Sequence, residues 1–327
     1  MADAVSPALK PRVAVVGSFN VDHVWRVPVL PQPGATLSGE YASGPGGKGF
    51  NQAVAARRAG AEASFVCALG GDLGAQLARS LCIGDGIDLR DAESLAPTGT
   101  AGIYVDAGGR NCIVIGAGAN ATLEPDFVSS SLAALDGVAV MLVQLESPPE
   151  AIARALEQGR AQGATSILNP APANATVSGQ MLELADILTP NETEFAALLG
   201  RHVGERIEAD AVSSLDQGRL HALCRLLGHG STVVVTMGAS GCFVSHPESN
   251  LRGDEAACYR ISADPANAID TTGAGDAFNG ALAASLALRP ASAGPAFIEH
   301  VRFASRYAAL STEREGAALA MPWLPAG

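Results

Sequence analysis

The sequence has few charged residues and few aromatic ones, and these shortages exclude several classes of protein. Only 17% of the 327 residues are charged, and 33 acidic residues against 21 basic ones give a formal net charge of −12. Without a basic run or a cluster of aromatics suited to stacking on bases, a nucleic-acid partner is not expected. No apolar run approaches the ~20 residues that a membrane helix needs, so no membrane partner is expected either.

Cysteine and histidine patterns are also missing. The six cysteines include no Cys-x-x-Cys pair, which favours reduced thiols in a cytoplasmic protein. No secretory signal is recognised at the N-terminus. The six histidines form no His-Glu-x-x-His metal pair, and no Gly-x-Ser-x-Gly turn is present. These absences argue against the common hydrolase classes.

Short apolar runs alternate with helical patterns along the chain. The expected strands are residues 12–17, 64–69, 138–143, 165–168, 187–189, 232–237 and 242–245, and helices are expected at 73–81 and 149–162. A hairpin is expected from 100–105 and 112–115, around the turn 106–109. This alternation predicts an α/β fold with a doubly wound, mainly parallel sheet. No linker or repeat divides the chain, so one domain is expected over residues 1–327.

A glycine-rich turn runs into a helix at residues 270–288. Phe278, Leu282 and Leu286 recur every four residues and should face a core. The residues before them, Gly273 to Gly275, let several backbone amides point at one spot at the positive end of the helix dipole, which is an anion site. Asp276 could be a helix cap or a base beside a bound phosphate, and we favour an anion hole with a catalytic base.

A second glycine-rich turn, residues 44–49, also feeds a helix, and this helix is expected to end at Gly60. Its Gly-x-Gly-x-x-Gly spacing matches the dinucleotide fingerprint but lies outside the first strand–helix turn, so that match is weak. It is not a phosphate-binding Walker loop, because Gly49 follows Lys48 where Ser or Thr is required. Lys48 and Asn51 can share one helix face as ligand-binding residues. The alternative is a solvated lysine beside a capping asparagine.

Polar residues follow the ends of several expected strands, where open α/β sheets bind ligands. Asn20 and Asp22 follow the first strand and are two apart, so in extended backbone they point the same way. Glu146 follows another strand, and Asn191 to Glu194 follow a third. The alternatives are turn residues for Asn20 and Asp22, a solvated loop residue for Glu146, and helix capping for Asn191.

Both glycine-rich segments resemble the signature motifs of a known family. GGKGFNQAVAARRAGA and DTTGAGDAFNGAL are similar to the two signatures of the ribokinase-like (PfkB) carbohydrate kinases, and the resemblance covers residues 12–322. The segments GSFNVDH, GAGANATL, QLESP, LNPAPA, LTPNETE and RFA resemble the ribokinase branch of that family. The resemblance implies an ATP-dependent sugar kinase that phosphorylates the 5-hydroxyl of D-ribose. The alternatives are a nucleoside kinase, another sugar kinase of the family, or a non-catalytic sugar-binding paralogue.

The resemblance also implies a role for each matching residue. Asp276 would be the base, with Gly273, Ala274 and Gly275 as its anion hole. The expected sugar-binding residues are Asn20, Asp22, Gly47, Lys48, Asn51 and Glu146. The expected nucleotide-binding residues are Asn191, Thr236, Gly238, Ala239, Ser240, Gly241, Gly275 and Ser305. The expected monovalent-cation (K⁺) residues are Asp270, Thr272, Ser311, Arg314, Gly316 and Ala320, and Glu194 would lie near Mg²⁺.

A small β-sheet lid is implied as well, at about residues 18–43 and 98–118, and in the family such lids often pair two subunits into a homodimer. Three positions depart from the family pattern. Phe50 stands where Ala is common and is expected to reshape the sugar pocket. Ser305 replaces a histidine near the adenine, and Ala320 offers the cation only a backbone carbonyl.

Overall fold

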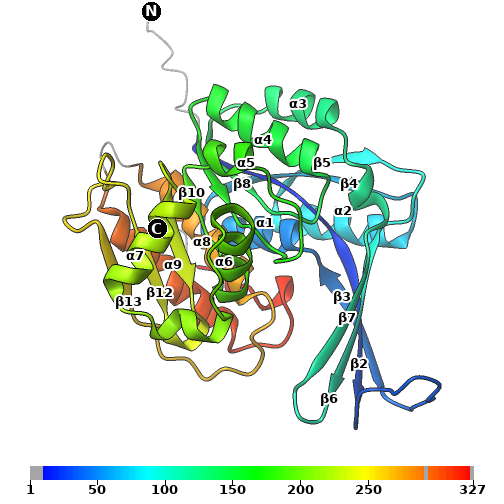
Figure 1. The fold of residues 1–327 in the computed structure, drawn as a ribbon. Coiled ribbons are helices and arrows are strands. Elements are labelled where there is room, and N and C mark those ends of the chain that lie inside the picture. Colours follow the sequence, from blue (N-terminus) through cyan, green and yellow to red (C-terminus); the bar gives the residue numbers. More distant parts are fainter. Residues whose placement is uncertain (1–9, 291–293, 325–327) are drawn as a thin grey trace, which may run out of the picture.

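The computed structural model describes residues 10–290 and 294–324, which form two β-sheets with helices around the larger one (Figure 1). The larger, here the main sheet, has the strand order β13-β12-β11-β10-β9-β8-β1-β4-β5. Only β12 runs antiparallel to its neighbours. Its strands are β1 (Arg12–Val16), β4 (Glu62–Leu69), β5 (Asp88–Glu93), β8 (Val138–Val143), β9 (Thr165–Leu168), β10 (Ile187–Leu188), β11 (Thr232–Thr236), β12 (Cys242–Ser245) and β13 (Cys258–Ile261).

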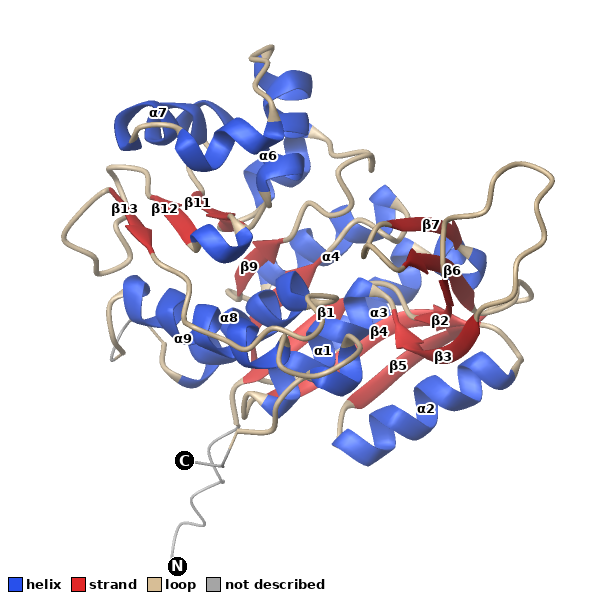
Figure 2. Cartoon of the chain, turned by 90° about the horizontal axis from the view of Figure 1, so that it is seen from below, coloured by secondary structure: helices blue, strands red, loops and turns tan. Residues whose placement is uncertain are grey.

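Helices cover both faces of the main sheet (Figures 1 and 2). They are α1 (Lys48–Arg58), α2 (Leu73–Asp85), α3 (Pro125–Ala133), α4 (Pro149–Ala161), α5 (Gly179–Leu184), α6 (Glu192–Leu198), α7 (Gln217–Leu227), α8 (Ala274–Leu288) and α9 (Phe297–Ser311). Single turns are η1 (Gly118–Thr122), η2 (Leu199–Val203), η3 (Ala209–Ser214), η4 (Gly238–Ser240) and η5 (Ala318–Ala320). None of the helices in the described ranges is long and apolar enough to cross a membrane.

The continuous apolar runs of the central strands follow from burial on both faces. In β1, Val13 and Val15 belong to the core that contains α1, α8 and α9, while Ala14 and Val16 belong to the core on the opposite face. Successive side chains of a strand point to opposite faces, so a strand covered on both sides needs apolar residues at every position. The predicted doubly wound, mainly parallel sheet is therefore confirmed.

A separate four-stranded sheet, the second sheet, projects from the body (Figure 1). Its strand order is β3-β2-β6-β7, from β2 (Asn20–Val27), β3 (Glu40–Gly46), β6 (Gly99–Asp106) and β7 (Asn111–Gly116). The predicted hairpin corresponds to β6 and β7, which pair antiparallel. The first segment expected for the lid stops at residue 43, whereas β3 continues to Gly46.

Several elements carry no clear sequence signal. The edge strand β5 has the sequence DLRDAE and pairs with β4, and its charges form ion pairs from Asp88 to Arg12 (3.2 Å) and from Asp91 to Arg79 (2.6 Å). An edge strand that is only half covered needs no apolar run, so a search for apolar runs misses it. The strand β13 and the helices α3, α7 and α9 were not predicted either.

The helix α8 is buried almost all round, between α1, α9 and the main sheet. Phe278 and Leu282 are buried as expected, and Leu286 is half-buried. Small residues allow α1 and α8 to approach closely. A Cβ atom added at Gly280 would lie 2.5 Å from both the Cβ of Ala55 and the backbone oxygen of Gln52.

We expect Gly280→Ala to force α1 and α8 apart and to lower the free energy of unfolding by about 1–3 kcal/mol, the usual effect of overpacking. Thermal and urea unfolding would measure the change. The matched control is Gly84→Ala in α2, where an added Cβ meets nothing within 4 Å. The control should be neutral or slightly stabilising, because alanine favours helix more than glycine does. Equal unfolding midpoints for both variants would contradict close packing at Gly280.

Candidate active site

The turn before α1 packs against the end of β1, and this contact requires glycine. Gly47 has φ +89°, and a Cβ there would lie 2.8 Å from the backbone nitrogen of Asn20. A Cβ at Gly49 would lie 2.5 Å from the backbone nitrogen of Ser18. Because the backbones touch, Lys48 at the first position of α1 is held beside the residues that follow β1.

The start of α8 brings Asp276 to the same place. Gly273 adopts the left-handed conformation that glycine tolerates, with φ +76°, and the first hydrogen bond into the helix runs from the amide of Ala277 to the oxygen of Gly273. The amides of Gly275 and Asp276 precede that bond, so they point out of the helix end as anion-binding donors do. Asp276 Oδ2 accepts a hydrogen bond from Asn51 Nδ2 at 2.9 Å.

Charges of both signs are buried together here. Burial alone would lower the pKa of the Lys48 ammonium, but the nearby carboxylates of Asp276, Glu146 and Glu194 outweigh it, so this pKa is raised. Burial raises the pKa of Asp276, and Lys48 together with hydrogen bonds from Asn51 and Gln52 partly offsets the effect. An ammonium among carboxylates stabilises the ionised form of each partner.

Three of the expected sugar-binding residues, Glu146, Asp22 and Asn51, lie near Lys48 and Asp276. Glu146 Oε2 accepts from Ser18 Oγ at 2.6 Å and from the Lys48 backbone nitrogen at 3.0 Å. Burial, with repulsion from Glu146 and Asp276, raises the pKa of Asp22 to about 7. Asn51 Oδ1 is buried and has no hydrogen-bond partner among the described residues. A buried acceptor of this kind is satisfied by a donor that binds there, such as a sugar hydroxyl.

Asn20 is buried, and its Oδ1 accepts from Asn120 Nδ2 at 2.8 Å. Asn120 also bonds both backbone groups of Phe19, so it fixes the start of β2. It was not predicted as a site residue. A Cβ on Gly99 would meet these two side-chain amides at 2.2–2.3 Å, which explains a glycine at the start of β6.

A cleft of about 170 Å³ lies at the starts of α1 and α8. The predicted residues that line it are Lys48, Asn191, Glu194, Thr236, Gly273, Ala274, Gly275 and Asp276. The lining residues that were not predicted are Asn169, Ala171, Thr189, Thr271 and Asn279. A larger hollow of about 340 Å³ lies around Arg160, Asp186 and His229, and no predicted site residue lines it.

Two of the residues missed by the sequence analysis stand just after the ends of β9 and β10, where a search of strand ends could find them. They are Asn169 and Thr189. Thr189 Oγ1 donates to Asn279 Oδ1 at 2.5 Å, and Asn279 Nδ2 donates to the backbone oxygen of Gly275 at 2.8 Å. These bonds join the start of α8 to the main sheet.

The expected nucleotide-binding residues fall in three places. Asn191 caps α6 in a reciprocal capping box with Glu194, so the capping interpretation holds, although both residues also line the cleft. Thr236 ends β11 beside Asn191, Gly238 to Ser240 form the exposed turn η4, and Gly241 after it is buried. Ser305 lies on α9 and does not line the cleft.

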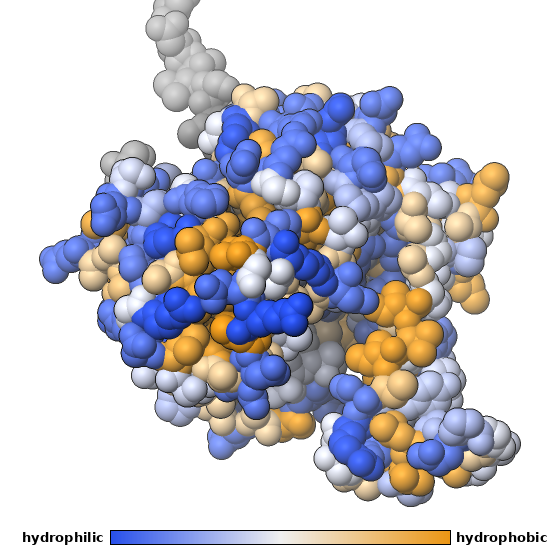
Figure 3. All heavy atoms as spheres, in the orientation of Figure 1, coloured by the Kyte–Doolittle hydropathy of each residue, from blue (hydrophilic) through white to orange (hydrophobic). Residues whose placement is uncertain are grey.

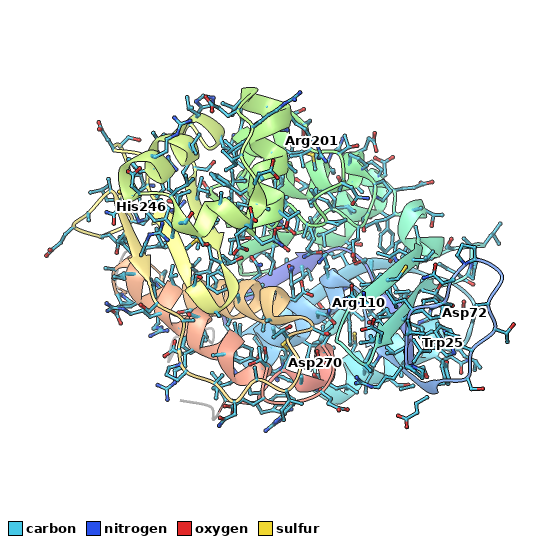
Figure 4. All side chains as sticks on the ribbon, turned by 60° about the horizontal axis from the view of Figure 1, so that its bottom comes forward. Trp25, Asp72, Arg110, Arg201, His246 and Asp270 are labelled. Carbon is cyan, nitrogen blue, oxygen red and sulfur yellow. The ribbon has the colours of Figure 1, made fainter. Side chains whose placement is uncertain are left out.

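Three of the expected cation residues, Asp270, Thr272 and Gly316, join two loops, whereas Ser311 ends α9 and Ala320 ends η5. Asp270 Oδ1 accepts from the backbone nitrogen and hydroxyl of Thr272, and Oδ2 accepts from the backbone nitrogen of Gly316. Burial would raise the pKa of Asp270, but these hydrogen bonds outweigh it and lower the pKa. Figure 4 labels Asp270 on the loop that leads to α8. Carboxylate, hydroxyl and carbonyl oxygens suit a hard cation. Arg314 is exposed and its guanidinium is positively charged, so only its backbone carbonyl could be a ligand.

The expectation for Phe50 is wrong. Its ring is 1% exposed and packs edge-on against Phe19, with ring centroids 5.1 Å apart, and against Phe65 at 6.0 Å. A side chain two positions after Lys48 points roughly 200° round the helix from it, so Phe50 enters the core between α1 and the main sheet on the other side of the helix. It does not line the cleft.

The fold and site together define a phosphotransferase of the carbohydrate kinase type, and comparisons with known proteins agree. The profile of the pfkB family carbohydrate kinases matches residues 10–324, so the chain belongs to this family. A ribokinase of Haemophilus influenzae is 36% identical over 319 residues, covering 96% of each chain. The structure of a ribokinase from Giardia lamblia superposes with a TM-score of 0.84 at 31% identity over 96% of each chain.

Two further relatives bear on ligands. The structure of an Arabidopsis thaliana ribokinase complexed with ribose and ATP has a TM-score of 0.75, 27% identity and 96% coverage of each chain. A deoxyribokinase of Salmonella typhi is 32% identical over 276 residues, covering 83% of this chain and 84% of the relative. The relatives therefore include proteins named for two sugars that differ by one hydroxyl.

Proposed function

We propose that this protein transfers the γ-phosphoryl group of ATP to the 5-hydroxyl of D-ribose. The observation that carries the proposal is the buried pairing of Asp276 with Asn51 and Lys48 beside the open amides of α8. The ribokinase relatives and the ribose–ATP complex of the Arabidopsis protein support this sugar and this nucleotide. A cytoplasmic location belongs to the same proposal and is supported by six cysteines that form no disulfide.

In the proposed reaction, Asp276 accepts the proton of the 5-hydroxyl. The hydroxyl oxygen forms a bond to the γ-phosphorus, and the bond from that phosphorus to the bridging oxygen breaks, leaving ADP. Lys48 keeps the carboxylate ionised, because its positive charge favours the base form of Asp276. The amides of Gly275 and Asp276 stabilise the negative charge on the transferring oxygens. A non-catalytic paralogue would not need an intact base, so the presence of Asp276 argues against that alternative.

Nucleotide and magnesium binding are assigned to the cleft wall. Asn191, Thr236 and the turn from Gly238 to Gly241 would hold the phosphates and the nucleoside, with Ser305 further off on α9. The described residues contain no group of three or more His, Cys, Asp or Glu side chains placed to hold a metal. This fits Mg²⁺, which binds kinases largely through substrate phosphates and water, with Glu194 nearby. When bound, Mg²⁺ would neutralise phosphate charge.

Sugar recognition is assigned to the polar residues around Lys48. They are Asn20, Asp22, Gly47, Lys48, Asn51 and Glu146. A site built to hydrogen-bond hydroxyls rejects an analogue that lacks one by as much as about 10⁴-fold, because its own buried groups are left unpaired. Phe50 packs in the core and is not among the residues that line the cleft, so its ring is not placed there to stack on a nucleobase. Both points favour free ribose over nucleosides.

A panel of acceptors with ATP tests the proposal. We expect kcat/KM for ribose to exceed that for 2-deoxyribose, and nucleosides to be poorer still. In Asp276→Asn, turnover should fall by about 10² to 10⁴, the typical contribution of a general base, while ribose and ATP still bind. Steady-state kinetics and calorimetry would measure both. A higher kcat/KM for 2-deoxyribose would identify a deoxyribose kinase, and one for inosine or adenosine would identify a nucleoside kinase.

We also propose that the loops joined by Asp270 bind K⁺. The oxygen donors are expected from Asp270, Thr272, Ser311, Arg314, Gly316 and Ala320, the last through its carbonyl. An ion there would order the turn before α8 without touching the substrate. We expect activity in K⁺ to exceed that in sodium or tetramethylammonium chloride at equal ionic strength, and Asp270→Asn to weaken the K⁺ effect. Equal rates in all three salts would contradict a K⁺ site.

The second sheet is proposed to act as a lid over the sugar and to pair with the same sheet of a second copy. Its support is the exposed side chains of Tyr41, Ile113, Val114 and Ile115. Figure 3 shows apolar surface on the projecting part of the molecule. We expect sedimentation velocity to show a dimer that Ile113→Glu with Ile115→Glu converts to a monomer. Leu95→Glu, at an exposed leucine outside the second sheet, is the control and should remain dimeric. A wild-type monomer at micromolar concentration would contradict the pairing.

A further inference from the structure

The side chain of Gln52 holds the other carboxylate oxygen of Asp276. Gln52 follows Asn51 on α1 and is 0% exposed. Its Nε2 donates to Asp276 Oδ1 at 2.9 Å and to Asn169 Oδ1 at 3.0 Å, which uses both hydrogens of the amide. Asp276 is therefore bonded on one side by Asn51 and on the other by Gln52.

A second glutamine, Gln144, hydrogen-bonds the oxygen of the Gln52 amide. Gln144, just after the end of β8, donates from Nε2 to Gln52 Oε1 at 2.5 Å and is also 0% exposed. Turning the Gln52 amide over would place Oε1 against the Asp276 carboxylate and Nε2 against the Gln144 amino group. The contact with the carboxylate would be repulsive, so an ionised Asp276 selects the observed arrangement, in which Gln144 donates and its own Oε1 has no partner among the described residues.

Gln144 is in turn held close to the chain that leaves β1. An ideal Cβ at Gly17 would lie 2.0 Å from Gln144 Oε1, so only glycine fits there. Asn169 Nδ2 donates to the backbone oxygen of Thr189 at 3.0 Å. The carboxylate is thus tied, through neutral amides alone, to residues that follow β8, β9 and β10.

We propose that Gln52 is a positioning residue for the phosphoryl transfer: it holds Oδ1 of Asp276 towards the interior and leaves Oδ2 to receive the hydroxyl proton. Oδ2 is the oxygen bonded by Asn51, whose own Oδ1 is buried and has no partner among the described residues, so a donor group that binds here can reach both side chains. A carboxylate oxygen has two lone pairs, so Oδ2 can accept from both Asn51 and the hydroxyl. This inference rests on the proposed function.

Gln52 also favours the charged form of the base. The charged groups near Asp276 are Lys48 on α1, Glu146 after β8, Glu194 on α6 and Asp22 on β2. Lys48 lowers the pKa of Asp276, and Glu146 raises it. Loss of the Gln52 donor would leave the three carboxylates and the burial in place, so the pKa of Asp276 would rise.

The test is Gln52→Met, which keeps the length of the side chain and removes both donors. A hydrogen bond to a charged group corresponds to a shift of about one to two pH units, so the acidic limb of kcat/KM should move up by that amount. Below the midpoint of the wild-type acidic limb kcat should fall about tenfold or more, with KM for ribose within about threefold of wild type, and it should recover at higher pH. Gln144→Met should shift the limb the same way by less.

Gln158→Met, on α4 and distant from Asp276, is the control and should leave the pH profile unchanged. A direct titration of Asp276 by carbon-13 NMR of aspartate-labelled protein, assigned with Asp276→Asn, needs no turnover. A raised pKa of Asp276 in Gln52→Met would support the positioning role of Gln52, even if the protein phosphorylated no sugar. A lack of sugar phosphorylation would contradict only the proposed function. Unshifted titrations in both Gln52→Met and Gln144→Met would overturn the inference. Should Gln52→Met fail to fold, Gln144→Met decides alone.

Discussion

The structure depends on keeping one carboxylate ionised inside the protein. Asp276 is 6% exposed at the contact of α1 and α8, where an uncompensated charge would cost several kcal/mol. Lys48 supplies the opposite charge, and Asn51 and Gln52 supply donors, all three from the first turns of α1. The two helices must therefore meet closely and in one register, and the glycine at position 280 permits this. Packing and chemistry are set by the same contact.

The sequence predicted most of this arrangement because its signals are local. Central strands buried on both faces are continuous apolar runs, and glycine-rich turns before helices mark anion sites, so the main sheet, Lys48 and Asp276 could all be found. The charged edge strand β5 lacks such a run. Gln52 sits inside a helix with no pattern of its own, and its partners Gln144 and Asn169 are 92 and 117 residues away in sequence. Only the fold reveals that they meet.

Phe50 illustrates the opposite error. Its neighbours in sequence belong to the candidate site, and proximity in sequence suggested a role in the pocket. The helical turn instead directs the ring between Phe19 and Phe65, where it supports α1 from behind. Sequence comparison identifies positions that depart from a family pattern, but the direction of a side chain decides what the departure affects.

The strand β2 belongs to the second sheet, yet its first residue lies against the turn before α1, and only residues 17–19 separate it from β1. The strand thus has the geometry of a lever anchored at its active-site end. Eight extended residues span about 26 Å, so a rotation of about ten degrees at the anchor would move the tip by about 4–5 Å and Asp22 by only about 1 Å. Small displacements of Asp22 are in this way geometrically linked to large displacements of the far end of the strand.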